Sequence, residues 1–505
     1  MPLHYDTTIG LEIHVQLNTA SKMFCRCSND AEGAEPNTLI CPICLGHPGT
    51  LPVINSEAIH KGARMALALQ CTINPLSKFD RKNYFYPDLP KGYQISQYDQ
   101  PVGKDGYIDI EITGAPEGQR TSAHIRFNRL HMEEDAAKLI HDGGSSLVDY
   151  NRGGTPLMEI VTEPDISSPL EAKIFLHELR LIARYLGVSE ADMEKGHLRC
   201  DANVSVQFEQ NGMRVTTPIS EIKNLNSFKS VESALIYEAD RLYQDFISGG
   251  ETSKRKNKIT VGWDEQKLIT TMQRGKEEAH DYKYFPEPDL PPLHFSMDDI
   301  AALHASLPEL PAARRKRFVS EYAISVADAR ILVDDKELSY FFEKATSELA
   351  EWMNAQGNHD EEIGNKAYQL LANWLLNRFV AVLNDRKIAI TETKVTPENF
   401  AQLVSRIAEK KINSTAAQEV LLQMIETGEE PDHIITNKGL EQVNDEGVIK
   451  EICQKIVDSN EKVVSEYKAG KENVLMFLVG QVMKESKGKA QPEMVKDVLQ
   501  QLLAQ

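Results

Sequence analysis

The chain has 505 residues, a formal net charge of −19, 41% hydrophobic residues and 26% charged residues. This length predicts two to four domains, and the composition is typical of a globular protein and disfavours a disordered chain. No apolar run approaches the ~18 residues that cross a bilayer, and the N-terminus lacks the regions of a signal peptide, so we expect a cytosolic protein without a membrane partner. The acidic balance disfavours non-specific nucleic-acid binding but allows a local basic patch.

Residues 9–17 predict a strand near the N-terminus. Apolar and polar side chains alternate there with the period of two that is typical of a half-buried strand. Glu12 and His14 share the polar face. A rigid strand that presents a carboxylate and an imidazole side by side is a starting point for a metal site. An ordinary solvated strand face is the alternative interpretation.

Four cysteines follow in two closely spaced pairs, Cys25 with Cys27 and Cys41 with Cys44. This arrangement is typical of a zinc site. Because protein would fill all four coordination positions, the zinc would hold a loop in place and would do no chemistry. The alternative is a set of reduced cysteines without a ligand. A disulfide framework is disfavoured by the odd total of seven cysteines and by a reducing compartment.

Two further predicted strands carry acids. Residues 122–132 read as a strand that runs into Glu133 and Glu134, and the pattern does not decide which of these two points inward. Glu159 lies within the apolar strand 157–161. An unpaired carboxylate buried there would be costly, and a role as a ligand would compensate for that cost.

A helix and a further alternating strand come next. Residues 168–187 predict an amphipathic helix with a proline just inside its start and a glycine past its end. Residues 198–206 alternate again, and Asp201 lies on their polar face. Lys223 follows, shortly before a helix that we expect to start near Phe228.

Prolines between residues 286 and 292 indicate a boundary. The fold class predicted is α+β: a β-rich domain over 1–294, a helical domain over 295–409 and a helical tail over 410–505. Lysines near the helix ends of this tail are typical of an RNA-binding surface on an otherwise acidic protein, and we single out Lys468, Lys471, Lys484 and Lys487.

The acids and the histidine on separate strands suggest one shared site. Four oxygen donors and one imidazole suit Mg²⁺ or Mn²⁺ better than zinc, and the residues concerned are Glu12, His14, Glu133 or Glu134, Glu159 and Asp201. Basic side chains nearby would bind a transferring phosphoryl group, with Lys82, Arg152 and Lys223 as candidates. P-loop, Rossmann, G-x-S-x-G and H-E-x-x-H motifs are absent from the sequence. We therefore predict a Mg²⁺-dependent enzyme of phosphoryl or acyl chemistry with RNA-binding helical domains.

Long motifs spread over the chain add a resemblance. They include Gly10–Val15, Lys78–Asp88, Arg129–Asp135, Leu198–Asn203, Lys223–Ser227, Asp281–Asp289 and Tyr467–Lys471. With these motifs the whole chain resembles the GatB family, the B subunits of tRNA-dependent aspartyl/glutamyl amidotransferases. The resemblance implies a cradle-shaped β-rich catalytic domain, a helical domain and a tail that contacts tRNA.

The resemblance also implies a reaction. ATP would phosphorylate the side-chain carboxylate of Glu-tRNA(Gln) or Asp-tRNA(Asn), and ammonia would then displace the phosphate. The partners implied are the amidase, or A, subunit, which releases the ammonia from glutamine, and a small C subunit. By position, His14, Glu134 and Glu159 would bind the principal Mg²⁺, and Glu12 and Asp201 would serve a second metal or the substrate. The main alternative is a non-catalytic, zinc-containing tRNA-binding scaffold, and a weaker one is a stand-alone Mg²⁺ hydrolase.

Overall fold

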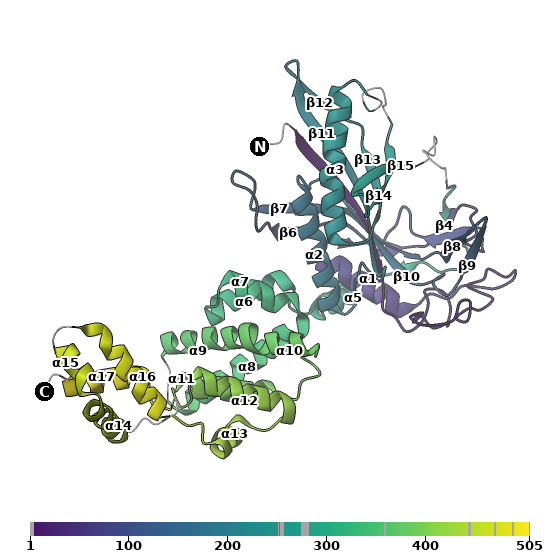
Figure 1. The fold of residues 1–505 in the computed structure, drawn as a ribbon. Coiled ribbons are helices and arrows are strands. Elements are labelled where there is room, and N and C mark those ends of the chain that lie inside the picture. Colours follow the sequence, from purple (N-terminus) through teal and green to yellow (C-terminus); the bar gives the residue numbers. More distant parts are fainter. Residues whose placement is uncertain are drawn as a thin grey trace. The chain divides into compact units, whose positions relative to one another are not determined.

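The structure is a computed structural model that describes residues 5–250, 252, 257–273, 282–357, 360–442, 446–468, 471–486 and 489–503. The chain forms two compact units, Met1–Pro311 and Ala312–Gln505 (Figure 1). The first unit contains a large sheet with helices, and the second is helical among its described residues. The predicted α+β fold class is confirmed.

Ten of the described strands form one sheet in the first unit. Its order is β15 (Ile269–Met272), β14 (Ile259–Asp264), β13 (Ser220–Leu225), β11 (Leu198–Gln210), β1 (Asp6–Gln16), β10 (Pro156–Thr162), β7 (Ser122–Glu134), β6 (Gly103–Glu111) and β2 (Thr72–Ile73), and β12 (Met213–Thr216) pairs with β11. Strand β1 lies in the middle, antiparallel to both β10 and β11. The predicted N-terminal strand is therefore confirmed as a central strand of this sheet.

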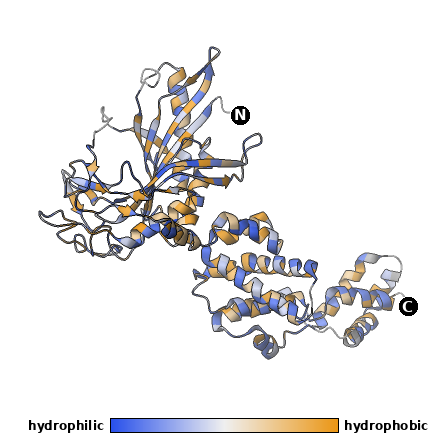
Figure 2. Cartoon of the chain, turned by 180° about the vertical axis from the view of Figure 1, so that it is seen from behind, coloured by the Kyte–Doolittle hydropathy of each residue, from blue (hydrophilic) through white to orange (hydrophobic). Residues whose placement is uncertain are grey.

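The alternation along β1 separates two faces of the sheet. Ile9, Leu11, Ile13 and Val15 are at most 1% exposed and belong to the main hydrophobic core. Figure 2 shows the same alternation as hydrophobic and hydrophilic segments along the long strands. Three helices contribute buried residues to this core, namely α1 (Ser56–Ala68), α2 (Pro169–Leu186) and α3 (Phe228–Ile247). The opposite face of β1 carries Glu12 and His14.

Helix α2 shows why the sequence signals at its ends were informative. The Ser168 side chain accepts a hydrogen bond from the backbone N–H of Glu171, and Pro169 occupies the first turn, where its missing N–H costs nothing. Gly187 ends the helix with a φ of +66°, a conformation that glycine adopts without strain. The helix predicted over 168–187 is thus confirmed.

Smaller sheets and helices complete the first unit. A three-stranded sheet joins β16 (Phe285–Pro286), β4 (Asp80–Asn83) and β5 (Tyr93–Ser96), β17 (Leu293–His294) pairs with β3 (Leu76–Ser77), and β8 (Lys138–Asp142) pairs with β9 (Ser145–Asp149). Helix α5 (Met297–Ala305) contributes Ile300 and Leu303 to the surroundings of the main core. The first compact unit ends at Pro311 and includes α5, and the domain boundary predicted at residue 294 stays a prediction.

The second unit consists of helices. These are α6 (Pro311–Tyr322), α7 (Val326–Asp334), α8 (Lys336–Ala355), α9 (Glu361–Trp374), α10 (Val380–Arg386), α11 (Pro397–Ala408), α12 (Ser414–Thr427), α13 (Pro431–Lys438), α14 (Glu446–Ser459), α15 (Glu461–Lys468), α16 (Leu475–Glu485) and α17 (Pro492–Leu503). A π-helical turn, Leu375–Phe379, joins α9 to α10. The last four helices share a hydrophobic core of their own, with Cys453, Leu478, Val482 and Leu499 at its centre. The division predicted at 409/410 stays a prediction. None of the helices in the described part of the chain is long and apolar enough to cross a membrane.

Candidate functional site

The register of four neighbouring strands places polar side chains in a row on the face opposite the core. Glu159 of β10 lies directly across from His131 of β7 on one side and from His14 of β1 on the other. His14 in turn lies across from Arg199 of β11, and Glu12 across from Asp201. Because directly opposed residues of a sheet point to the same face, these side chains converge without any loop to position them.

The centre of the row has the donors of a cation site. His14 Nε2 lies 3.3 Å from Glu159 Oε2 and 3.8 Å from both Glu12 Oε1 and Glu133 Oε1. His131 Nε2 lies 3.4 Å from Glu159 Oε2. Two overlapping groups, Glu12–His14–Glu159 and His131–Glu133–Glu159, each have ligand atoms within 4.8 Å of one another. Carboxylate oxygens combined with imidazole nitrogens at this spacing fit a divalent cation.

The structure places Glu133 and Glu134 on different faces of β7. Glu133 faces His14 and Glu159, whereas the adjacent Glu134 points to the other side of the strand. There the Glu134 carboxylate binds the Lys91 ammonium and accepts a hydrogen bond of 2.9 Å from the backbone N–H of Ile95. Successive residues of a strand face opposite ways, so only one of the two acids can join His14. Glu133 therefore lies beside His14 and Glu159, and which of the two acids binds a metal stays a prediction.

The charges of the cluster are mutually dependent. Burial alone would lower the pKa of His14, but the hydrogen bond with Glu159 and the charges of Glu133, Glu159 and Glu12 raise it to about 9. The pKa of Glu159 is held low despite burial, because His131 and His14 offset the cost of desolvating its charge. Burial raises the pKa of Glu12, and the charge of Glu159 adds to that rise. The His14 imidazole is therefore protonated at neutral pH and offsets part of the negative charge of these carboxylates.

Two lysines border the cluster. Lys223 of β13 donates to Asp201 Oδ2 over 2.6 Å. Lys82 of β4 lies with its Nζ 5.1 Å from the centre of the Tyr282 ring. Although burial opposes it, the charges of Glu133 and Glu159 raise the pKa of Lys82. Both lysines therefore add positive charge close to the acids of the row.

Arg152, the third basic candidate, lies apart from the group of acids and histidines around His14. Its guanidinium donates to the backbone oxygens of Ala136 and Ala137, each over 2.9 Å. It also lies 3.8 Å from Asp135 Oδ2. Asp135 accepts further hydrogen bonds of 2.7 Å from Gln16 and from Arg199. Arg152 therefore fixes the end of β7 and extends the polar face beyond His14 and Arg199.

A cavity of about 210 Å³ lies on the side of the strand that Glu134 faces. Its lining combines the Glu134–Lys91 ion pair with Arg81, Asp289 and the cysteine segment around Cys44. Arg81 is held in place by hydrogen bonds of 2.7 and 2.8 Å to the buried carboxylate of Glu287. The polar cluster around His14 and the cysteine segment therefore lie on opposite sides of the end of β7.

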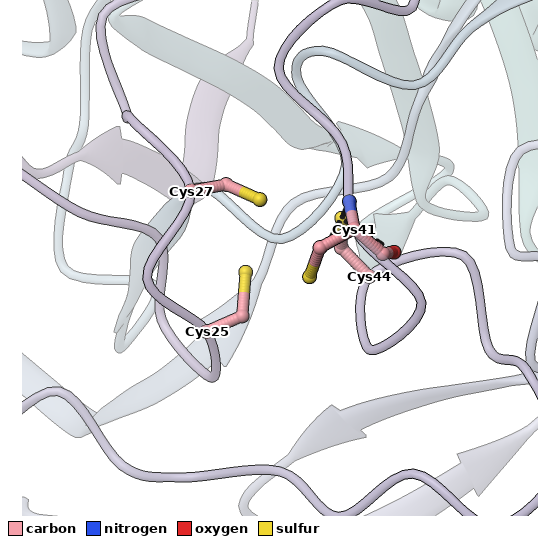
Figure 3. Close-up of side chains that lie close together, drawn as sticks. All are labelled: Cys25, Cys27, Cys41 and Cys44. Carbon is pink, nitrogen blue, oxygen red and sulfur yellow. Dashed lines mark hydrogen bonds between the residues drawn. The ribbon is translucent and has the colours of Figure 1, made fainter.

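The four predicted zinc ligands come together. Figure 3 shows the sulfurs of Cys25 and Cys27 directed towards those of Cys41 and Cys44, and all four lie within 4.8 Å of one another. Cys41 and Cys44 have their sulfurs 3.9 Å apart, close to the ~3.8 Å between neighbouring ligands of a tetrahedral zinc with bonds of about 2.3 Å. A hydrogen bond from Cys25 lowers the pKa of Cys44 to about 5, and burial raises the pKa of Cys27 to about 11. The donor set fits a closed zinc site.

The predicted RNA-binding lysines are only partly described. Lys484 is exposed on α16, and Lys471 is exposed with its Nζ 3.2 Å from Glu466 Oε2. Lys468 ends α15, but its side chain and the whole of Lys487 lie outside the described residues. Whether these lysines form one surface stays a prediction.

Sequence reasoning did not select His131, although a usable signal was present. His131 and Glu133 stand two residues apart on a strand, which repeats the spacing of Glu12 and His14. Because residues two apart on a strand share a face, His131 is expected on the same face as Glu133. Asp135 and Arg199 were harder to find, because the contact that pairs them joins β11 to a residue just past the end of β7.

Comparison with known proteins places this architecture in a family. A family model described as the GatB/GatE catalytic domain matches residues 7–301, and a second one, described as the GatB domain, matches residues 360–503. These regions correspond to the sheet-containing unit with its polar row and to most of the helical unit. The chain belongs to the GatB family.

Curated relatives agree over the full length. Proteins named as the B subunit of aspartyl/glutamyl-tRNA(Asn/Gln) amidotransferase from Thermotoga maritima and Persephonella marina are each 46% identical to this chain. A protein of the same name from Dehalococcoides mccartyi is 47% identical. Each match covers 99% of this chain and at least 99% of the relative. The resemblance found in the motifs is thereby confirmed.

Proposed function

We propose that this chain is the B subunit of a tRNA-dependent amidotransferase and carries its transferase site on the polar row of the sheet. The observation that supports this most directly is the convergence of His14, Glu133 and Glu159 from three adjacent strands. The substrate would be Glu-tRNA(Gln), Asp-tRNA(Asn) or both. The products would be Gln-tRNA(Gln) and Asn-tRNA(Asn).

The reaction needs an activated carboxylate, because oxide is too poor a leaving group for ammonia to displace directly. A side-chain carboxylate oxygen attacks the γ-phosphorus of ATP, and ADP leaves. Ammonia then adds to the carbonyl carbon of the acyl phosphate, phosphate leaves with the bonding electron pair, and the amide nitrogen loses a proton. This chain needs no nucleophile of its own, in keeping with the absence of a G-x-S-x-G motif from its sequence.

The acids and the histidine on the polar face of the sheet would have two roles. His14, Glu133 and Glu159 would hold the principal Mg²⁺, while Glu12 and Asp201 would hold a second cation or orient the substrate. Bound Mg²⁺ would supply neutralising charge for phosphoryl oxygens. Lys223, which donates to Asp201, and Lys82, whose pKa the charges of Glu133 and Glu159 raise, would bind the phosphates of ATP.

Metal, partners and tRNA complete the proposal. A zinc ion bound by Cys25, Cys27, Cys41 and Cys44 would hold its loop in place and take no part in the reaction. The amidase, or A, subunit would supply ammonia from glutamine, and a small C subunit would complete a heterotrimer. Lysines of the tail, Lys468, Lys471, Lys484 and Lys487, would contact the tRNA backbone. The named relatives, which are B subunits of such enzymes, support this assembly.

The test uses the complex reconstituted with its A and C subunits. Each misacylated tRNA is incubated with ATP, Mg²⁺ and glutamine, and the amino acid released from the tRNA is then identified. We expect conversion of glutamate to glutamine, or of aspartate to asparagine, only when all components are present. A chain that binds tRNA but supports no conversion under any of these conditions would favour the scaffold alternative. Phosphate release without tRNA would favour the hydrolase.

A further inference from the structure

Lys22 is completely buried beside the four cysteines. It is 0% exposed and is among the largest fully buried side chains of the chain. Its Nζ lies 3.2 Å from the backbone oxygen of Tyr150 and 4.0 Å from Cys44 Sγ. Among the described residues, this ammonium has the Tyr150 oxygen and Cys44 Sγ as its partners and no carboxylate within 4.0 Å. A buried positive charge without a counter-charge is costly, so the surroundings of Lys22 need an explanation.

The cysteine cluster supplies that counter-charge, and supplies most of it when all four sulfurs are metal-bound thiolates. Four thiolates around one Zn²⁺ carry a net charge of −2, and the sulfur nearest to Lys22 belongs to one of them, Cys44. The backbone N–H of Cys41 donates to the same sulfur over 3.1 Å. Cys44 therefore has two donors close to it, one neutral and one charged. Partners of this kind orient metal ligands and tune their affinity.

We propose that Lys22 is a positioning residue for the zinc site: its ammonium compensates the charge of metal-bound Cys44 and ties the cysteine loop to the carbonyl of Tyr150. The inference rests on zinc being the ion bound by these cysteines. It concerns Lys22 alone and assigns no catalytic role to it.

Further hydrogen bonds near Lys22 also connect the cysteine loop to residues 150–154, which precede β10. The backbone N–H of Met23 donates to the Gly154 oxygen over 2.7 Å, and the backbone N–H of Leu39 donates to Asn151 Oδ1 over 2.9 Å. Gly154, at a φ of +86°, packs closely enough that a Cβ there would lie 3.5 Å from Lys22 Cδ. The cysteine loop is thus attached to the 150–154 segment by Lys22, Met23 and Leu39 together.

The experiment compares Lys22→Met with the unchanged protein, using the full-length chain loaded with zinc. Zinc affinity is measured by competition with a chromophoric chelator. Methionine keeps the length and apolar stem but removes the charge, so we expect zinc to be bound at least tenfold more weakly. Lys61→Met is the matched control, because the Lys61 ammonium binds Asn18 and Glu57 instead of a sulfur. We expect that control to bind zinc as the unchanged protein does.

Two further readouts separate charge from packing. Four zinc-bound thiolates carry more negative charge than the zinc-free cluster, so Lys22→Met is expected to lower the thermal midpoint of the zinc-loaded protein by more than that of the zinc-free protein. In the cobalt-substituted protein, loss of the nearby cation should move the sulfur-to-metal charge-transfer band to lower energy. Lys22→Arg, which keeps the charge, should recover part of the affinity if the methionine variant folds poorly.

The possible failures are distinct. Zinc affinity of Lys22→Met within twofold of the unchanged protein, with an unmoved cobalt band, would overturn the role of Lys22 and leave the zinc site standing. If Lys22→Met destabilises the protein equally with and without zinc, the role of Lys22 is also overturned, because the effect would then come from packing and not from charge. An unchanged chain that binds no zinc would overturn the zinc assignment and this inference together.

Discussion

His14 and Glu159 face each other across β1 and β10, with Nε2 and Oε2 3.3 Å apart. Each belongs to the rigid centre of the sheet, and their backbones are fixed by the ladder itself. A cation between them would replace the proton that the imidazole now contributes. This pair is therefore the first place at which the proposed transferase site can be tested.

We expect Glu159→Gln to abolish transamidation and to weaken Mg²⁺ binding by at least a hundredfold, while tRNA binding stays near normal. The amide keeps the shape but loses the charge that pairs with both His14 and His131. Glu163→Gln, just beyond the end of the same strand, is the control, since the Glu163 carboxylate accepts a hydrogen bond from Asn128 instead of facing a histidine. Full turnover in the Glu159 variant would contradict the cation site.

Neighbouring acids of β7 should behave differently from each other. Glu133→Gln is expected to lose Mg²⁺ affinity, because this carboxylate lies 3.8 Å from His14 Nε2. Glu134→Gln should keep Mg²⁺ affinity, because its partners are Lys91 and the N–H of Ile95 on the other face. Titration of each purified variant with Mn²⁺, followed by electron paramagnetic resonance, measures this directly. The reverse order of affinities would restore Glu134 as the ligand.

Cation affinity should rise with pH. The pKa of His14 is raised to about 9 in the metal-free protein, so below that pH a metal must displace a proton. We expect affinity to increase by up to tenfold per pH unit from pH 7 and to level off above pH 9. Calorimetry in two buffers with different ionisation heats at pH 7 should detect release of about one proton per ion. Identical affinities at pH 7 and pH 9 would show that His14 is no ligand.

The same proton has an effect on stability in the absence of metal. The pKa of His14 in the fold lies above the unfolded value of about 6.5, so protonated His14 favours the fold. This contribution is complete below pH 6.5 and is lost as the pH rises to 9. Thermal unfolding of metal-free protein between pH 6 and pH 9 should therefore show a decline that His14→Gln removes.

Lysines of the tail that contact tRNA should make its affinity depend on the salt concentration. Lys484→Gln is expected to weaken binding and to reduce the slope of log affinity against log salt by about one unit, the effect of losing one phosphate contact. Lys471→Gln should have a smaller effect, because Glu466 already pairs with Lys471. Lys455→Gln, whose Nζ binds Glu485, is the comparison residue. A slope that none of these changes alters would place the tRNA elsewhere.

A buried network in the first unit gives a stability test apart from the proposed site. Glu238 is 0% exposed and accepts hydrogen bonds from Ser220, Thr270 and Arg241. Glu238→Ala leaves these donors unpaired, so we expect a loss of about 3 kcal/mol in the free energy of unfolding. Glu232→Ala, at the more exposed pair with Lys173, should cost less than about 1 kcal/mol. Denaturant titration measures both.

Periodicity and spacing predicted much of the fold. The alternation of residues 9–17 predicted β1 because one face is buried and the other is not, and the helix signals at Ser168 and Gly187 predicted α2 because the helix ends use local hydrogen bonds. The cysteine pairs predicted their cluster because a closed four-ligand site needs short loops. These features all depend on residues close together in the sequence.

Other parts of the site depend on how distant strands align, which local patterns do not encode. Whether Glu133 or Glu134 faces His14 follows from the register of β7 against β10. The contact between Lys22 and the carbonyl of Tyr150 joins residues far apart in the chain, and a lone lysine in a sequence gives no sign of burial. Local patterns also did not separate the basic residues, since Lys223 donates to Asp201 but Arg152 binds backbone oxygens.

The placement of Glu133 and Glu134 on opposite sides of one strand limits how this protein can change during evolution. Insertion or deletion of a single residue within β7 after Arg129 would exchange the surroundings of the two acids and would remove His131 from Glu159. Changes of length should therefore be tolerated in the turn between β6 and β7, around residues 113–119, and rejected between Arg129 and Asp135. A survey of natural variants of this chain should find its insertions and deletions distributed accordingly.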